Sequence, residues 1–255
     1  MTIGITERGD AGIDMSWTNK IHKVNGVILI TKNITDAFAK KVIALHKNNY
    51  KIIVHCTCTG WGNSYMEPNV PSFETQIKNL DNLIKNGFPI NQIVLRIDPI
   101  FPTAEGLQRV YNVLNEAHNA PHLNKLQNVR IRISIYNEYA HIRKRLQDNG
   151  LNNIYNGALF APDYLMSFTR HKLKKFAETY NIRYECCAEP KLSDDIFDHC
   201  GCISNKDLSI LGLDNIPETN INKQNRYGCL CLSCKKELLT NRQQCPHKCL
   251  YCYWK

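Results

Sequence analysis

The chain has 255 residues, 43% of them hydrophobic and 22% charged, and its formal net charge is +9. This length permits one large α/β domain or two small ones, and we expect one main domain. No stretch approaches the roughly 18 apolar residues of a membrane span, and the first residues are too polar for a signal peptide. We therefore expect a soluble, cytoplasmic protein without a membrane partner.

Six short apolar segments rich in β-branched residues predict strands, at residues 2–6, 26–31, 50–59, 92–98, 129–136 and 182–189. Amphipathic segments between them predict helices at 14–23, 35–47, 72–85, 104–118, 138–148 and 163–180. This alternation indicates a parallel sheet with right-handed crossovers. Six such units predict an α/β fold of the partial (β/α)6 TIM-barrel type, because a closed barrel needs eight.

Polar side chains follow the predicted strands at their carboxyl ends, where parallel-sheet proteins place ligand sites. For any single one of these residues, an ion pair at the barrel rim is the commoner role. Together they predict a polar pocket for a zwitterionic or phosphorylated ligand. The residues are Arg8, Asp10, Lys32, Trp61, Arg96, Asp98 and Glu189.

The regular alternation ends at Pro190, which predicts a barrel of residues 1–190 and a cysteine-rich segment of residues 191–255. The second segment has two short helical possibilities, at 205–213 and 233–239. With so little apolar periodicity it would need a metal to fold, because the free energy of metal binding replaces that of a core. We expect it to lie over the barrel mouth as a metal-binding cap.

The twelve cysteines favour metal binding over disulfides in a chain of this size without a signal peptide. Cys56 and Cys58 can act as small apolar core residues. Cys245, Cys249 and Cys252 follow the spacing Cys-x3-Cys-x2-Cys in the last residues of the chain. Structural zinc takes four ligands, whereas three thiolates in one loop suit three irons of a [4Fe-4S] cluster.

This terminal motif resembles that of radical S-adenosylmethionine enzymes, in which an aromatic residue precedes the third cysteine, as Tyr251 does here. The resemblance implies that Cys245, Cys249 and Cys252 hold a [4Fe-4S] cluster that binds S-adenosylmethionine and generates a 5′-deoxyadenosyl radical. It also implies an electron donor such as flavodoxin or ferredoxin. In that superfamily the motif follows the first strand, whereas here the tail would reach the barrel mouth from the other end of the chain.

The chain as a whole resembles a domain-of-unknown-function family of bacterial and phage proteins with partial-TIM-barrel character and a C-terminal cysteine motif. The matching stretches are TERGDAGIDMSW, LITKNI, TGWGNSYMEPNVP, LRIDPI, CAEP, HCGCIS and CPHKCLYCYW. The motif is also similar to that of spore photoproduct lyases, which repair DNA. Together with the net charge of +9, this similarity favours a nucleic-acid base as the substrate, for repair or modification.

The radical S-adenosylmethionine superfamily usually holds the methionyl amine with a Gly-Gly-Glu stretch, and this chain has Thr-Lys-Asn after its second predicted strand. We therefore expect a carboxylate among the polar strand-end residues to hold the amine and a cation to hold the carboxylate group. Arg96, Asp98 and Lys32 are predicted to be catalytic, and Glu189, Arg8, Asp10 and Tyr251 to bind the cofactor.

Four further cysteines are expected to hold a second Fe–S cluster or a zinc ion, with free thiols as the remaining possibility. Cys187 ends the sixth predicted strand, Cys202 lies in HCGCIS, and Cys229 and Cys231 form a Cys-x-Cys pair. Further candidates for this second site are Cys186, Cys200 and Cys234; His199 and His247 could replace a ligand, but a lone histidine is more often a surface group, and neither is predicted to do so.

A competing hypothesis is a non-catalytic module, stapled by zinc or an Fe–S cluster, that binds nucleic acid through its basic surface and Trp17, Trp61 and Trp254. Metal content separates the hypotheses, because a brown protein supports the enzyme and a colourless zinc protein supports the module. A chain end stays ordered only when it is tied down. For the enzyme we expect a buried tail, with Tyr253 and Trp254 packed over the cluster or against the barrel.

Overall fold

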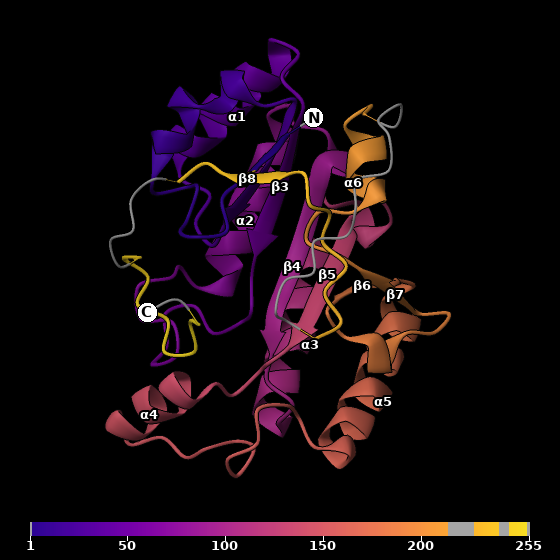
Figure 1. The fold of residues 1–255 in the computed structure, drawn as a ribbon. Coiled ribbons are helices and arrows are strands. Elements are labelled where there is room, and N and C mark those ends of the chain that lie inside the picture. Colours follow the sequence, from indigo (N-terminus) through magenta and orange to yellow (C-terminus); the bar gives the residue numbers. More distant parts are fainter. Residues whose placement is uncertain (1, 214–226, 240–244, 254–255) are drawn as a thin grey trace.

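The computed structural model describes residues 2–213, 227–239 and 245–253. In this part of the chain, eight parallel strands form a single sheet with helices around it (Figure 1). The protein therefore has the α/β fold that the alternating segments predict. The strands are β1 (Ile3–Ile5), β2 (Gly26–Thr31), β3 (Ile52–Thr57), β4 (Ile93–Ile100), β5 (Arg130–Ile135), β6 (Tyr184–Cys187), β7 (Phe197–Cys200) and β8 (Lys235–Glu237).

The strands lie in the order β7-β6-β5-β4-β3-β2-β1-β8 across the sheet. From β1 to β7, neighbours in the sheet are also neighbours in the chain. This is the strand order of a β/α barrel, whereas a doubly wound sheet reverses its order near the middle. Within the described residues, β7 and β8 are the two edges and do not pair with each other.

The helices agree closely with the amphipathic pattern. Thr35, Ser72 and Thr103 each accept a hydrogen bond from a first-turn backbone N–H, which sets where three of the helices begin. None of the described helices has the length and apolar character needed to cross a membrane. The α-helices are α1 (Asp36–Lys47), α2 (Phe73–Lys85), α3 (Ala104–Asn119), α4 (Ala140–Asp148), α5 (Asp163–Tyr180) and α6 (Asn205–Ile210).

Short 3₁₀ helices replace one of the predicted α-helices. Residues 14–23 form η1 (Met15–Asn19) and η2 (Ile21–Lys23), because the Trp17 indole donates to the Ala11 carbonyl at 2.9 Å and holds the segment against the core. The other 3₁₀ helices are η3 (Ile90–Gln92), η4 (Asn124–Leu126) and η5 (Pro190–Leu192).

The two edge strands β7 and β8 come from the segment assigned to the cap. The prediction of a helix at 233–239 is wrong, because Lys235–Glu237 pairs in parallel with β1. Leu238 fills the space above Gly4, where an added Cβ would lie 2.6 Å from its Cδ1. Tertiary contacts thus override the local helix preference of a short segment. The boundary at residue 190 stays a prediction, although the chain beyond it supplies both edges of the sheet.

The two faces of the sheet differ in chemistry. The helix-covered outer face is an apolar core that includes Cys56 and Cys58, which are 1% and 0% exposed and act as apolar residues, as expected. On the inner face, apolar residues such as Val94 pack with Leu208 of α6 and Leu232. The chain after β7 therefore covers this face, and Figure 1 shows it passing in front of β4 and β5.

Candidate functional site

The last described segment, residues 245–253, is called the terminal loop, and it is anchored rather than frayed. Its Leu250 N–H donates to the Met66 carbonyl at 3.0 Å. From α4, Arg145 donates to the carbonyls of Leu250 and Cys252, at 3.1 and 2.8 Å. In Figure 1 the C-terminal end lies on the same side of the molecule as α4. Residues 247, 249 and 251 of the tail are buried, but the expectation that Tyr253 packs over the cluster or against the barrel is wrong, because its side chain is 53% exposed; Trp254 lies outside the described residues.

His247 ties the middle of the terminal loop to the residues that follow β1. Its ring is 2% exposed, with Nε2 2.7 Å from Asp10 Oδ2 and Nδ1 3.0 Å from the Asn69 carbonyl. Asp10 also accepts hydrogen bonds from the Thr31 hydroxyl and the Lys32 backbone N–H, both at 2.6 Å. The spacing of the cysteines did not identify His247 as an anchor, because its partners lie far away in sequence.

Tyr251 anchors the loop at a second point. The ring is 7% exposed, and its hydroxyl donates to the carboxylate of Glu67. Lys32 Nζ lies 2.7 Å from Glu67 Oε1 and 2.8 Å from the Tyr251 oxygen, and Thr59 donates to the same Glu67 oxygen at 2.8 Å. Glu67 was missed by the analysis of strand ends, because it lies inside the loop between β3 and α2. Its only signal is its place in the stretch TGWGNSYMEPNVP.

The three cysteines of the terminal loop share one small region. Cys249 is buried, and Cys245 and Cys252 are partly buried. Burial raises the pKa of Cys249 to about 12, with Cys245 and Cys252 contributing and the charge of Lys32 acting against them. The terminal loop thus places one buried and two partly buried thiols near the charge of Lys32, and thiols are the ligand type that Fe–S clusters take.

Lys32 is a buried cation between Glu67 and the cysteines. Burial alone would lower its pKa, but the Glu67 carboxylate and Cys249 outweigh that effect, and the pKa of Lys32 is raised. Lys32 therefore carries a charge at neutral pH. The predicted strand-end residue Lys32 and the predicted tail residue Tyr251 are thus brought together.

Arg96 and Asp98 lie at the carboxyl end of β4 and form an ion pair. The Ser134 hydroxyl of β5 donates to the other oxygen of Asp98. Asp98 also acts electrostatically on Lys32, and Arg96 acts on Glu7, which follows β1. Arg96 and Asp98 thus lie within electrostatic range of residues that follow β1 and β2, and the common pocket at the strand ends stays a prediction.

The remaining predicted mouth residues have different surroundings. Glu189 accepts a hydrogen bond from the Ile135 backbone N–H at 2.9 Å, so it lies beside the end of β5. Arg8 is exposed, and its backbone N–H donates to Glu237 near the edge strand β8. Trp61 is 4% exposed, with the Arg109 guanidinium 4.0 Å from its ring centre.

The second cysteine set consists of Cys187, Cys202, Cys229 and Cys231, and the fold brings these four together. The sulfurs of Cys187 and Cys202 are 3.3 Å apart, and the Cys202 backbone N–H donates to the sulfur of Cys231 at 3.1 Å. The neighbouring thiols of Cys187 and Cys202 lower the pKa of Cys231 to about 7. A hydrogen bond with Cys231 lowers the pKa of Cys229 to about 6.

The further cysteine and histidine candidates have other surroundings. Cys186 is part of the outer apolar core, and Cys200 is the register partner of Cys187 on β7. The Cys234 carbonyl accepts from the backbone of β1, and the His199 ring lies 2.8 Å from the Gly228 carbonyl. In the part of the chain that the structure describes, no three His, Cys, Asp or Glu side chains are arranged to hold a single metal ion.

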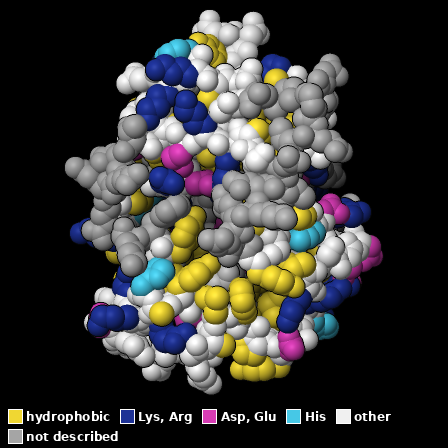
Figure 2. Space-filling model, viewed as in Figure 1, with side chains coloured by type: hydrophobic (Ala, Val, Ile, Leu, Met, Phe, Trp, Pro, Cys, Tyr) yellow, Lys and Arg dark blue, Asp and Glu magenta, His cyan; other side chains and the backbone are white. Residues whose placement is uncertain are grey.

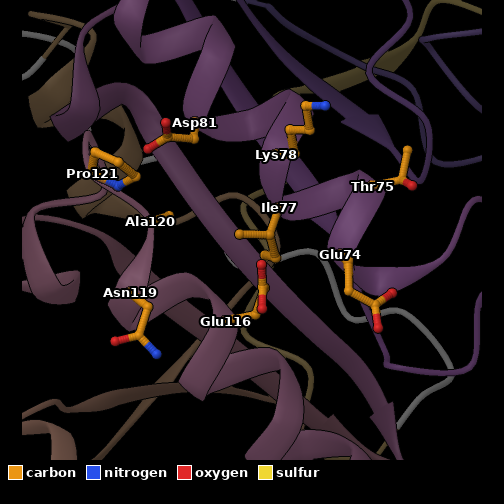
Figure 3. A pocket seen from close by; sticks show the side chains of 9 residues that line it. All are labelled: Glu74, Thr75, Ile77, Lys78, Asp81, Glu116, Asn119, Ala120 and Pro121. Atoms are coloured by element: carbon orange, nitrogen blue, oxygen red, sulfur yellow. The ribbon is translucent and has the colours of Figure 1, made fainter.

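A groove of about 360 Å³ lies between α2 and α3, away from the cysteines. Figure 3 shows its lining, which includes Glu74, Lys78, Asp81 and Glu116. The ring of His122 lies 2.8 Å from the Asp81 carboxylate. None of the residues predicted to form the site lines this groove, so it is distinct from the candidate site.

Figure 2 shows the molecular surface from the same side as Figure 1. Hydrophobic side chains gather in the lower half of this view, with Lys and Arg side chains around them. Exposed aromatic residues in the described chain include Phe160, Tyr164 and Tyr227, at 49%, 69% and 66% exposure. The rings of Phe160 and Tyr227 lie 6.3 Å apart. Trp17 is fully buried and Trp61 nearly so, and neither therefore forms the exposed binding surface that the non-catalytic hypothesis expected.

Comparison with known proteins gives one family match. A family model described as "Domain of unknown function (DUF1848)" matches residues 14–254. The matched region contains both cysteine sets and the polar residues of β4, while Arg8 and Asp10 precede it. No curated protein matches the chain.

Proposed function

The chain belongs to the DUF1848 family, and we propose that it is a radical S-adenosylmethionine enzyme with a [4Fe-4S] cluster on Cys245, Cys249 and Cys252. The observation that carries this proposal is the burial of the terminal loop at the strand ends. A chain end without a role is usually frayed, whereas His247 and Tyr251 are 2% and 7% exposed. We further propose that the sheet is a partial barrel whose mouth holds the reaction site.

The cluster, when bound, supplies an electron for the cleavage of S-adenosylmethionine to an organic radical. The protein positions the three thiols and keeps water away from them. Cys249 and Tyr251 pack with Phe101 in one apolar cluster, which excludes water from that side of the loop. Lys32 places a positive charge beside Cys249, where it stabilises negative charge on the sulfur.

The methionyl group of S-adenosylmethionine is a zwitterion, and it needs both an anion and a cation to hold it. Glu67 is fully buried, acts electrostatically on Cys249, and has an oxygen, Oε2, without a hydrogen-bond partner among the described residues. The Nε of Arg96 likewise has no partner in that part of the chain. We assign amine binding to Glu67 and carboxylate binding to Arg96, with Asp98 and Glu189 as further polar groups of the mouth.

Asp10 has a positioning role in this proposal. Its two carboxylate oxygens accept hydrogen bonds from Gly12, Thr31 and the backbone of Lys32, and Oδ2 also contacts His247. Because both carboxylate oxygens of Asp10 are engaged by protein groups, we assign it to orienting the terminal loop and not to contacting the cofactor.

For the substrate we propose a nucleic-acid base. The support is the net charge of +9 and the exposed rings of Phe160 and Tyr227. Aromatic rings and nearby cations can bind unpaired bases by stacking. A base within a duplex would have to be flipped out to reach the mouth.

For the electron donor we propose an acidic redox protein such as flavodoxin or ferredoxin, docked on α4. This helix contacts the terminal loop through Arg145, and Lys144 is 78% exposed on the same helix. Lys248 adds an exposed cation on the loop itself. A positive surface next to the cluster ligands would favour docking of an acidic donor.

The test of the enzyme is anaerobic reconstitution with iron and sulfide, followed by an assay of S-adenosylmethionine cleavage with a chemical reductant. We expect a brown protein with cleavage activity. The triple variant Cys245→Ala, Cys249→Ala, Cys252→Ala should lose that activity together with roughly four irons per chain. A Cys234→Ala control should keep both, and a triple variant that binds as much iron as the unmodified protein would contradict the proposal.

The donor surface has a separate test. Lys144→Glu should slow cleavage driven by reduced flavodoxin by roughly tenfold, because it reverses a charge at the docking face. The same variant should keep the rate obtained with dithionite, which needs no docking surface. Equal rates with flavodoxin in the variant and the unmodified protein would rule out α4 as the docking site.

A further inference from the structure

The second cysteine set is assembled from three separate parts of the chain. Cys187 ends β6, Cys202 follows β7, and Cys229 and Cys231 lie in the segment just before β8. The sulfurs of Cys187 and Cys202 are 3.3 Å apart, and the Cys202 backbone N–H donates to the sulfur of Cys231 at 3.1 Å. A cysteine that serves only as a small apolar residue packs among hydrophobic side chains. The close approach of the sulfurs to one another therefore needs another explanation.

The neighbouring residue Cys186 shows how a packing cysteine behaves in the same strand. Successive side chains of a strand point to opposite faces. Cys186 therefore enters the outer apolar core, where it packs among hydrophobic side chains. Cys187 faces the other way and contacts sulfur. Both residues are buried, so the difference between them is the environment and not the exposure.

Positive charges line the second cysteine set. Cys187 and Cys202 act electrostatically on Arg96, and Cys202 and Cys231 act on Lys235. Arg132 also donates to the Cys202 carbonyl at 3.0 Å. Each of these cations also pairs with a carboxylate, namely Asp98, Glu185 and Glu7, so it is the meeting of the sulfurs that favours a metal–thiolate centre.

We propose that Cys187, Cys202, Cys229 and Cys231 bind a thiophilic metal centre of their own, separate from the terminal loop. A single zinc ion and an Fe–S cluster share this thiolate chemistry. The sulfurs of Cys187 and Cys202 are in contact, and among the described residues no three possible ligands are arranged around a metal position. Metal binding would therefore require these side chains to rotate so that their sulfurs move apart. The centre would link the end of β6 to the residues after β7 and to the segment before β8. It would thereby hold in place the chain that covers the inner face of the sheet.

The experiment uses the full chain with Cys245, Cys249 and Cys252 each changed to Ser, so that the proposed function is absent from the outset. This parent is purified anaerobically after growth with both iron and zinc, and its metals are measured by mass spectrometry. We expect roughly one zinc in a colourless protein, or roughly four irons with sulfide in a brown one. Either result supports the metal centre and identifies its type.

Matched variants of the parent then assign the ligands. Cys187→Ala should lower the metal content to roughly a tenth, while Cys186→Ala should retain it. Cys229→Ser is a second test at a partly exposed position, where folding is less sensitive, and it should also lose metal. Circular dichroism checks that each variant is folded.

Three results would overturn the proposal. The first is a folded parent without metal, and the second is equal metal content in the Cys187→Ala and Cys186→Ala variants. The third is a Cys187 to Cys202 disulfide found by peptide mapping of the anaerobic protein. Because the parent lacks the terminal cysteines, none of these results depends on whether the chain cleaves S-adenosylmethionine.

Discussion

The terminal loop and the second cysteine set reach similar chemistry by opposite routes. The terminal loop carries three thiols within eight residues, so its ligands are close in sequence, and the structural problem is to hold the loop in place. The second set collects four thiols from β6, the residues after β7 and the segment before β8, and the sheet itself brings them together. A short motif thus depends on its anchors, whereas a dispersed set depends on the fold.

The largest expected effect comes from removing the main anchor of the terminal loop. Asp10→Ala should lower the free energy of unfolding by about 3–5 kcal/mol, because it removes the acceptor of hydrogen bonds from Gly12, Thr31 and Lys32 and the buried partner of His247. Urea unfolding measures the change, and limited proteolysis should show faster loss of the terminal loop. Asp148→Ala removes an exposed pair with Lys144 and should change stability by less than about 0.5 kcal/mol. Equal effects of the two variants would refute the anchoring role.

Strong acid should weaken the ion pairs of Glu185, two residues before Cys187 on β6. Burial alone would raise the pKa of Glu185, but Arg132 and Arg130 lower it from 4.5 to about 2. The folded group holds its proton less tightly than the unfolded one, so its contribution is present above pH 4.5 and is lost as the pH falls towards 2. The contribution amounts to roughly 3 kcal/mol, and it is measured by urea unfolding across that range.

Glu185→Gln is the control for this pH dependence. The variant should be less stable at neutral pH, and its stability should change less between pH 4.5 and 2. An unchanged acid profile in Glu185→Gln would show that other carboxylates carry the dependence.

A smaller effect is expected at the second anchor of the terminal loop. Tyr251→Phe removes a hydrogen bond to the buried Glu67 and should cost about 1–3 kcal/mol in unfolding free energy. Tyr164→Phe, at a 69% exposed ring, should leave stability within about 0.5 kcal/mol. If Tyr251→Phe is as stable as the unmodified protein, the ring alone holds the loop, and Glu67 contributes nothing to anchoring.

The smallest predicted change is at α4. Arg145→Lys removes the guanidinium that donates hydrogen bonds to the carbonyls of both Leu250 and Cys252. It should lower the free energy of unfolding by about 1 kcal/mol. Hydrogen exchange should rise in residues 247–252 and stay constant around Cys187. Increased exchange at both places would mean that the two cysteine regions open together.

The sequence predicted the elements of this fold closely wherever local chemistry decides them. The six predicted strands are all present, and α1, α2 and α3 begin next to Thr or Ser residues that bond the first turn. The segments 14–23 and 233–239 departed from the prediction, because Trp17 and Leu238 are held by contacts with distant residues. Such contacts leave no trace in local periodicity.

The residues proposed as ligands were singled out from the sequence, but the residues that hold the terminal loop in place were not. Spacing singled out the terminal cysteines and Tyr251, and the ends of the strands singled out Lys32, Arg96 and Asp98. Glu67 and His247 were missed, because each is defined by a partner more than a hundred residues away. The competing hypothesis used Trp17 and Trp61 to bind nucleic acid, but both rings are buried, because large aromatic side chains gain much from burial.

Local order in the chain accounts for the strand and helix pattern, the parallel sheet and the three-thiol motif, because hydrogen bonding and side-chain periodicity act over a few residues. Only the folded chain decided that β8 completes the edge beside β1, that Asp10 and Glu67 hold the terminal loop, and that the four sulfurs of the second set meet. These contacts join residues that are far apart in sequence. They form only when burial of the shared core offsets the entropy of bringing those residues together.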